Sequence, residues 1–326
     1  MTKKEYGILN SYLANGSIEV SEYFEKDENG QFTGKFKTNS NCKLVSINKI
    51  FGSSISCSQY DVVAHGEGNE EEKIDSIYSS SLQSLLFFYG VSESNPIHIG
   101  KDKDEFNKVL FEYENPVIRY PSSMDVVLLN EEKGTIAFVE SKYLEIIRDS
   151  NKDGNKVVGV SYFRDSEKSG YKSLSFQKED LEKMRIEYPG NPYIDKVVDN
   201  HKMSISALDD KSYVYSEGIK QILSHIIGIQ NFKKVETYSS FDPIKNHKLF
   251  KKVIYVELYN SFEGINDIVM QSKINDFKEH CKIVKKVITS KEGLVDKFLV
   301  KSYQDLAKAN DNYKIDTNVE KYYRLK

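Results

Sequence analysis

Two short apolar runs separated by a polar turn give the clearest structural signal in the chain. The runs are Val126 to Leu129 and Ile136 to Val139, and the residues between them, 130–134, read NEEKG. Short runs that are rich in β-branched residues and bounded by turn residues predict a β-hairpin. The second run is nearly continuous from Thr135 onward, which is typical of a strand covered on both faces.

Charged residues occupy the open end of this hairpin. Asp125 begins the first strand, and Glu140 and Lys142 follow the second run. Because side chains alternate between the two faces of a strand, Glu140 and Lys142 share a face with Phe138 and lie about 7 Å apart. Burying a carboxylate and an ammonium is costly unless they are paired or bind an ion. Such pairs also occur on solvated sheet faces, but the apolar run before Glu140 favours a functional cluster.

Two carboxylates and a lysine in one cluster suit metal-dependent hydrolysis of phosphodiester bonds. Mg²⁺ is usually held by one or two carboxylates, while waters and substrate phosphates complete its coordination shell. We expect Asp125 and Glu140 to be these ligands, the backbone carbonyl of Ser141 to be a further one, and Mn²⁺ to be able to substitute. Lys142 is expected to orient the attacking water or to offset charge in the transition state.

Helical and strand-like patterns surround the hairpin. Apolar residues at helical spacing predict a helix over residues 70–90, with Asn69 as its N-cap. A second helix is expected over residues 216–230. Further strands are expected over residues 34–37, 43–47, 111–118 and 252–258.

The order of these residues resembles a known motif. Asp125, followed by a hairpin and then by Glu140-Ser141-Lys142, resembles the core motif of the PD-(D/E)XK nuclease superfamily, to which many restriction endonucleases belong. Met124 stands where the motif has its proline, a departure that the superfamily tolerates. Other stretches resemble a bacterial, restriction-endonuclease-like branch of the superfamily. They are residues 80–91 (SSLQSLLFFYGV), 138–145 (FVESKYLE), 217–229 (EGIKQILSHIIGI) and 298–306 (FLVKSYQDL).

The resemblance implies an α/β fold with a restriction-endonuclease-like α-β-β-β-α-β core, in which helices flank a mixed central sheet, plus N-terminal and C-terminal additions. In such cores the first helix often supplies an acidic metal ligand. Glu71, which shares a helical face with Ile74 and Tyr78, is the candidate, although an acidic residue there also simply stabilises a helix N-terminus. On the second helix, Gln221 is a candidate to bind a phosphate or a metal-bound water, and His225 is interpreted as a packing residue.

The chain is predicted to divide into three regions. Residues 1–65 form an N-terminal extension of unknown role. Residues 66–262 form the nuclease-like core with an insertion at 146–215, and residues 263–326 form a helical C-terminal region packed on that core. The insertion is longer than ordinary connections between elements. Its interleaved basic and aromatic residues suit contact with a nucleic-acid strand, or they simply belong to a surface loop of a tyrosine-rich protein.

The composition is that of a soluble globular protein, with 39% hydrophobic and 29% charged residues among 326. Apolar runs fall short of the roughly 20 residues of a transmembrane helix, and the N-terminus lacks a signal-peptide core. We therefore expect a cytoplasmic protein without membrane contact. The three cysteines are far apart and the histidines form no zinc-binding pattern, so a bound metal is expected to have oxygen ligands.

Charge gives a mixed signal about nucleic acid. The net charge of −3 does not indicate phosphate binding. Basic residues nevertheless gather at 233–234, 245–252 and 278–286. A nuclease requires some of them to lie beside Asp125, whereas the simpler interpretation is that they are solvated faces of helices and loops.

The sequence therefore predicts a Mg²⁺-dependent endonuclease that hydrolyses phosphodiester bonds, with DNA favoured over RNA as its partner. By the resemblance, a role in restriction or anti-phage defence would be typical. One alternative is a catalytically inactive nucleic-acid-binding or assembly module with the same fold. Another is an enzyme such as a glycosidase, which uses two carboxylates for acid–base chemistry and has no need of Lys142. A homodimer or an activating partner protein stays open.

Overall fold

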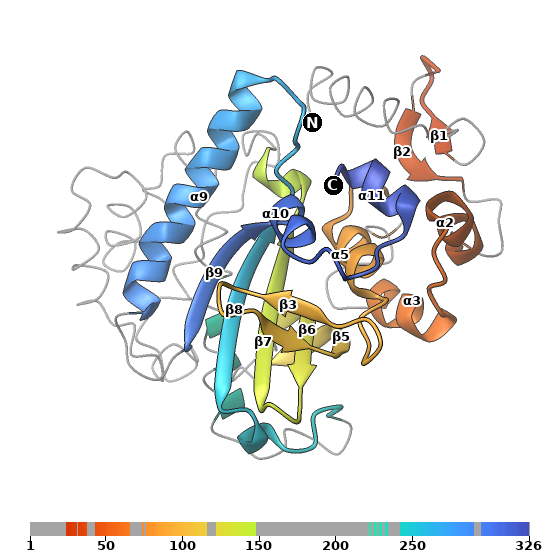
Figure 1. The fold of residues 1–326 in the computed structure, drawn as a ribbon. Helices are drawn as coiled ribbons and strands as arrows, with labels where there is room; N and C mark the ends of the chain where they lie inside the picture. The colour runs from red at the N-terminus through yellow and green to blue at the C-terminus, as the bar shows by residue number, and fades with distance from the viewer. Residues whose placement is uncertain are drawn as a thin grey trace, which may run out of the picture.

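The computed structural model describes most of two long segments of the chain and parts of a third. The described residues are 24–30, 32–37, 43–65, 74, 76–115, 122–147, 222, 225–226, 228–229, 232–233, 242–289 and 295–325. Within them the protein is a mixed α/β structure built around one five-stranded sheet that is flanked by helices (Figure 1). This confirms the α/β class and the mixed central sheet.

The central sheet has the strand order β5-β6-β7-β8-β9. Strand β6 is antiparallel to both β5 and β7, whereas β8 runs parallel to β7 and β9 runs parallel to β8. Their bounds are Lys108–Asn115 for β5, Ser122–Asn130 for β6, Thr135–Lys142 for β7, Lys252–Tyr259 for β8 and Lys297–Ser302 for β9. The predicted hairpin is confirmed as β6 and β7.

The two central strands are covered on both faces. Every residue of β7 is buried, and so is every residue of β8 after Lys252. Parallel strands need crossover connections that place helices on the faces of the sheet, so continuous apolar runs are expected at these positions. The nearly continuous apolar run from Thr135 to Val139 in the sequence is therefore explained by the burial of β7 on both faces.

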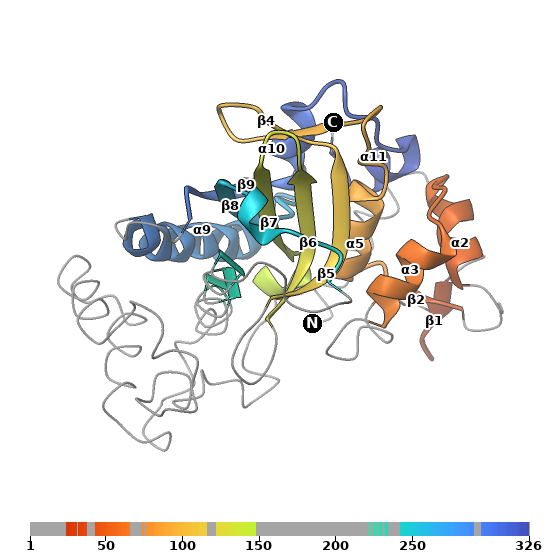
Figure 2. The ribbon, with the colours of Figure 1, turned by 90° about the horizontal axis from the view of Figure 1, so that it is seen from below.

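Helices cover the two faces of the sheet differently (Figure 2). On one face α9 (Ile268–Thr289) places Phe277 against Tyr259 of β8, with ring centroids 5.5 Å apart. On the other face α5 (Ser80–Phe88) lies against β7, where the Ser141 hydroxyl donates to the Ser80 carbonyl over 3.3 Å. Residues on β7 that face α9 are therefore separated from those that face α5.

The N-terminal and C-terminal parts of the described chain pack on each other beside α5. The Phe51 ring of α2 (Lys43–Phe51) lies 5.3 Å from the Tyr322 ring of α11 (Thr317–Tyr323). Asn318 also donates to the Ile50 carbonyl over 3.0 Å. The other small elements are β1 (Phe24–Lys26), β2 (Phe32–Phe36), α3 (Cys57–Ala64), η1 (Leu144–Ile146), η7 (His247–Leu249) and α10 (Tyr303–Lys308).

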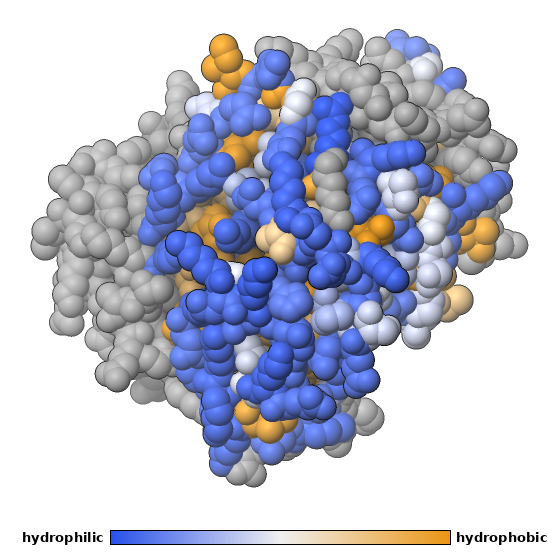
Figure 3. Space-filling model, viewed as in Figure 1, coloured by the Kyte–Doolittle hydropathy of each residue, from blue (hydrophilic) through white to orange (hydrophobic). Residues whose placement is uncertain are grey.

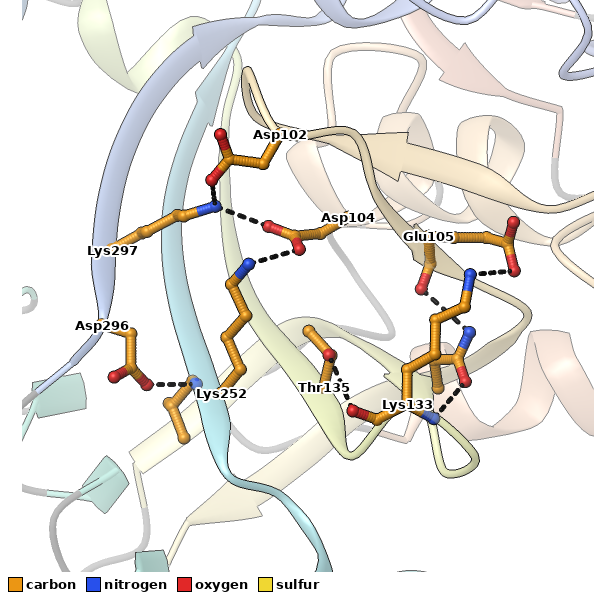
Figure 4. Close-up of polar contacts among 10 residues, drawn as sticks. Asp102, Asp104, Glu105, Lys133, Thr135, Lys252, Asp296 and Lys297 are labelled. Atoms are coloured by element: carbon orange, nitrogen blue, oxygen red, sulfur yellow. Dashed lines mark hydrogen bonds and ion pairs between the residues drawn. The ribbon is translucent and has the colours of Figure 1, made fainter.

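A hairpin of β3 (Ile97–Ile99) and β4 (Asp104–Phe106) crosses the sheet near the start of its parallel strands (Figure 4). Asp104 pairs with Lys252 at 2.5 Å and with Lys297 at 2.7 Å, so one carboxylate joins the beginnings of β8 and β9. Glu105 pairs with Lys133 of the β6–β7 turn at 2.9 Å. Figure 3 shows that this side of the molecule is mainly hydrophilic, consistent with these solvent-facing ion pairs.

Three predicted elements differ in the structure. The helix over residues 70–90 was predicted too long, because Ser79 accepts a hydrogen bond from the Leu82 N–H and so caps a helix that begins at Ser80. The strand over residues 43–47 is wrong, since Leu44, Ile47 and Ile50 bury one face of a helix, α2. The first core strand is shifted, because β5 begins at Lys108.

The C-terminal region is not wholly helical as predicted. After α9 the chain returns as β9, which pairs with β8 and extends the central sheet. The apolar run Phe298–Val300 is the sequence signal for this strand. The proposed boundaries at residues 65 and 262 stay a prediction. Within the described residues, helices are either too short or too polar to cross a membrane.

Gly134 is predicted to be essential for the hairpin turn. Its φ is +59°, and an added Cβ would lie 2.7 Å from the Leu249 carbonyl oxygen. Gly30 has a similar φ of +74° but open space around it. We expect Gly30→Ala to lower the free energy of unfolding by about 1 kcal/mol from backbone strain alone, and Gly134→Ala to lower it by at least twice as much. Urea unfolding of the two variants checks this, and equal losses would contradict it.

Candidate active site

Asp125 and Ser141 are joined at the point where β6 and β7 separate. Backbone pairing between these strands ends at Val126 and Val139. Beyond this pair the Asp125 carboxylate replaces the backbone partner, because its Oδ2 accepts a 2.6 Å hydrogen bond from the Ser141 N–H. In an extended strand the N–H and C=O of one residue face the same neighbouring strand. The Ser141 carbonyl therefore lies on the Asp125 side of β7.

Glu140 is buried and contacts a nitrogen group with each of its carboxylate oxygens. Oε1 forms an ion pair with Lys142 Nζ, and Oε2 lies 3.0 Å from His225 Nε2. Burial alone would raise the pKa of Glu140, but the charges of Lys142 and His225 outweigh it and lower the pKa to about 2. Glu140 therefore remains negatively charged throughout the physiological pH range.

Asp125 has the opposite electrostatic environment. Burial is the main cause that raises its pKa well above the usual range, and the negative charges of Glu140 and Glu112 raise it further. Lys142 and the Ser141 N–H oppose this only in part. A second ionised carboxylate beside Glu140 is thus disfavoured unless a cation is added.

Four acidic residues occupy successive register positions across the sheet. The pairs Phe111–Val126 and Tyr113–Met124 place Glu112 opposite Asp125, and continuing the β6–β7 register by one residue places Asp125 opposite Glu140. Glu140 is in turn the register partner of Glu257 on β8. We call Glu112, Asp125, Glu140 and Glu257 the acidic row.

The two ends of the acidic row differ in their surroundings. Glu112 has a φ of +47°, which is uncommon for a residue other than glycine. It also lines a cavity of about 530 Å³ between β5, α3 and the segment at Asp242 and Pro243. At this end the row therefore reaches an open cavity, whereas at the other end Glu257 is 1% exposed.

One carboxyl oxygen of Glu257 accepts a hydrogen bond, and the other has no hydrogen-bond partner among the described residues. The Tyr255 hydroxyl donates to its Oε1 over 2.5 Å, while Oε2 is buried without a hydrogen-bond partner among the described residues. Burial raises the pKa of Glu257 to about 8, and the charge of Glu140 adds to this against the opposing charge of Lys142. Near neutral pH the Glu257 carboxyl is therefore largely protonated in the folded protein.

The residues present fit a hard divalent cation at Asp125 and Glu140. The donors are carboxylate oxygens together with the Ser141 carbonyl, which is the ligand chemistry that Mg²⁺ prefers. A cation there would also relieve the repulsion that raises the pKa of Asp125. No cluster of three or more Asp, Glu, His or Cys side chains arranged for metal binding occurs in the described part of the chain. A cation there would thus be held by two carboxylates and one backbone carbonyl.

The structure brings together the main candidates from the sequence. Asp125, Glu140, Ser141 and Lys142 meet at one end of the hairpin, as the alternation of side chains predicted. Glu71 and Gln221 lie outside the described residues, as does the insertion from residue 148 onward. The roles of all these residues stay predictions.

Three residues of the site were not identified from the sequence. His225, interpreted as a packing residue, contacts the Glu140 carboxylate. Glu257 interrupts the buried apolar run of β8 just as Glu140 interrupts that of β7, so the same signal was available in the sequence. Glu112 carried no distinguishing signal, because strand β5 is an edge strand in which charged residues are common.

The basic segments lie at different ends of the sheet. Lys278 of α9 lies 5.4 Å from the ring centroid of Tyr259, the register partner of Lys142, so it is at the site end. The segment 245–252 precedes β8 and therefore lies at the opposite end. Of these two segments, α9 is the one that brings positive charge toward the acidic row.

Comparison of the chain with protein-family models, with curated proteins and with solved structures found no match. The case for a function therefore rests on the residues and geometry of the site.

Glu257→Gln is expected to change how stability depends on pH. In metal-free buffer the folded protein retains the Glu257 proton up to a pKa of about 8, whereas the unfolded chain loses it near the ordinary value of 4.5. The free energy of unfolding of the native sequence should thus fall as pH rises between these values. Glutamine removes this loss, so the variant should gain at least about 1 kcal/mol relative to the native protein between pH 5 and 9.

Urea unfolding across that pH range provides the measurement. The groups around Glu257 are Tyr255, Glu140, Lys142 and Cys281, and they are unchanged in the variant. Glu263→Gln, which alters an exposed carboxylate paired with Lys308, serves as the control. A parallel pH profile for Glu257→Gln and the native protein would refute the assignment.

Proposed function

We propose that the chain is a Mg²⁺-dependent nuclease of the PD-(D/E)XK type that hydrolyses phosphodiester bonds in DNA. The observation that supports it most is the contact between the Asp125 carboxylate and the Ser141 N–H. This contact holds Asp125 beside Glu140 and Lys142 at the open end of a hairpin. Mn²⁺ is expected to substitute for Mg²⁺.

The arrangement of the elements also supports the proposal. Helix α5 is followed by the added β3–β4 hairpin and then by the antiparallel strands β5, β6 and β7. The helical residues described between 222 and 233 come next, and then the parallel strand β8. This agrees with the α-β-β-β-α-β order that the resemblance implies. The strand β9 and the small terminal elements are additions to that order.

Each residue of the site has a distinct proposed role. Asp125 and Glu140 hold the cation, with the Ser141 carbonyl as a further ligand. When bound, Mg²⁺ supplies a polarised phosphate and a water of lowered pKa. Lys142, whose ammonium is positioned beside Glu140, orients that water or offsets developing negative charge. His225 holds the second oxygen of Glu140 and so keeps the carboxylate oriented.

DNA is favoured over RNA, and a role in restriction or anti-phage defence is carried over from the resemblance alone. Lys278 on α9 is a candidate to contact the phosphate backbone, because it lies over the same face as the site. A glycosidase is disfavoured, since its chemistry gives no role to a buried lysine paired with one of the two carboxylates. A catalytically inactive binding or assembly module remains the second candidate.

Asp125→Asn and Lys142→Met are expected to reduce cleavage of plasmid DNA in Mg²⁺ at least about 100-fold. The first substitution removes a cation ligand without changing shape, and the second removes the ammonium while keeping the length of the side chain. Agarose-gel assays of nicking and linearisation, at matched protein concentration, measure the effect. Circular dichroism must show that each variant retains its fold.

Asp102→Asn and Lys308→Met are the matched controls. Asp102→Asn removes a negative charge, as Asp125→Asn does, and Lys308→Met removes a positive charge, as Lys142→Met does. Both controls alter surface ion pairs outside the acidic row, so both variants should cleave DNA normally. Full cleavage by Asp125→Asn and Lys142→Met would overturn the proposal. A native protein that cleaves with neither Mg²⁺ nor Mn²⁺ would instead favour the inactive module.

A further inference from the structure

Strand β5 forms one edge of the central sheet in the described structure, on the side of α3 (Figure 2). In an edge strand, alternate residues direct both their N–H and their C=O away from the sheet. Val109, Leu110 and Phe111 lie in this strand and form no backbone hydrogen bond outside the sheet within the described residues. The edge therefore retains backbone groups with which a further strand can pair.

The cavity that Glu112 lines follows this edge. Its lining includes every residue of β5 from Val109 to Glu114, a stretch of about 17 Å in an extended strand. The remaining lining residues come from α3 and from the segment at Asp242 and Pro243. We call this cavity the β5 groove. A groove that runs along a strand edge suits an extended chain better than a compact ligand such as a single nucleobase.

The β5 groove offers apolar surface that water reaches. Val62 of α3 is 49% exposed, and Val109 and Leu110 of β5 are only partly buried although they pack against the core. Burial of apolar surface favours association by about 25 cal/mol per Å². Because side chains of a strand alternate between two faces, an added strand is expected to carry apolar side chains at every second position.

The charged residues that line the groove, among those described, are all acidic. They are Glu112, Glu114 and Asp242. Asp242 is buried and already contacts Tyr113 and His247, whereas Glu114 is exposed. Lysine or arginine side chains complement this negative charge, and the phosphate backbone of a nucleic acid is repelled by it. Charge therefore favours a basic peptide over a nucleic acid.

We propose that the β5 groove docks an extended basic segment of a partner protein, which adds a strand to the sheet beside β5. Main-chain hydrogen bonds to β5 supply much of the affinity, and alternating apolar and basic side chains supply the selectivity. The groove is distinct from the proposed cation site at Asp125 and Glu140, although Glu112 belongs to both the groove and the acidic row. The inference does not depend on the proposed function.

Binding of a labelled peptide to the full chain tests the docking. The probe is a fluorescein-labelled peptide of about seven residues in which valine and lysine alternate, and fluorescence anisotropy should show saturable binding in the micromolar range. Replacing its lysines by glutamate should weaken binding at least about tenfold. Two further peptides are N-methylated on one or the other alternate set of residues. Only the set that faces β5 is needed for strand pairing, so one of the two should bind at least about tenfold more weakly than the other.

Val62→Arg and Glu114→Lys are expected to weaken binding of the valine–lysine peptide at least about fivefold, because each adds a positive charge beside a basic ligand. Val45→Arg changes a valine that is 58% exposed on α2, and Glu263→Lys reverses an exposed carboxylate. These matched controls lie outside the groove lining and should bind the peptide normally. Circular dichroism must show that all four variants are folded.

Hydrogen exchange in β5 identifies the occupant. The valine–lysine peptide should slow exchange of amides in residues 108–115. Lack of saturable binding up to about 1 mM peptide, equal binding of the two N-methylated peptides, or unchanged exchange in β5 would overturn the inference. Protection of these amides by a single-stranded oligonucleotide would assign the groove to nucleic acid instead. Protection that rises with protein concentration in the absence of peptide would assign it to a second copy of the chain, and either result would also overturn the inference.

Discussion

The hydrogen bond from the Ser141 backbone N–H to the Asp125 carboxylate is the constraint on which the candidate site depends. It forms where the β6–β7 ladder ends, so a side chain satisfies a backbone donor that a strand would otherwise pair. This has two effects at once. The buried N–H of β7 is not left without an acceptor, and a carboxylate is fixed within electrostatic range of Glu140 and Lys142.

Within the described residues, the site that follows from this constraint brings several buried acidic groups close together. Lys142 and His225 both contact Glu140, and together they lower its pKa to about 2. Asp125 and Glu257, on either side of it, have raised pKa values because burial and the charge of Glu140 act in the same direction. Under the proposed function, binding of a cation to this row would be coupled to the release of protons from it.

Ion pairs connect the strands of the sheet at the end opposite to this row. The β3–β4 hairpin ties the starts of β8 and β9 together through Asp104 and fastens the β6–β7 turn through Glu105 (Figure 4). Near the site, the Tyr303 hydroxyl lies 2.7 Å from the Ser141 hydroxyl on the α5 side of the sheet. The C-terminal region therefore supports the strand that carries Glu140 and Lys142.

The sequence by itself determined the hairpin, the burial of its second strand and the convergence of Asp125, Glu140 and Lys142, because these follow from a period of two residues and from turn chemistry within one short segment. Local pattern did not fix where α5 begins, since Ser79 competes as a cap within a longer apolar stretch. It also could not show that β9 joins the sheet, that His225 reaches Glu140, or that Glu257 lies opposite it. Those contacts join residues far apart in the chain, and only the parallel register of β7, β8 and β9 and the helix packed across them decided which side chains meet.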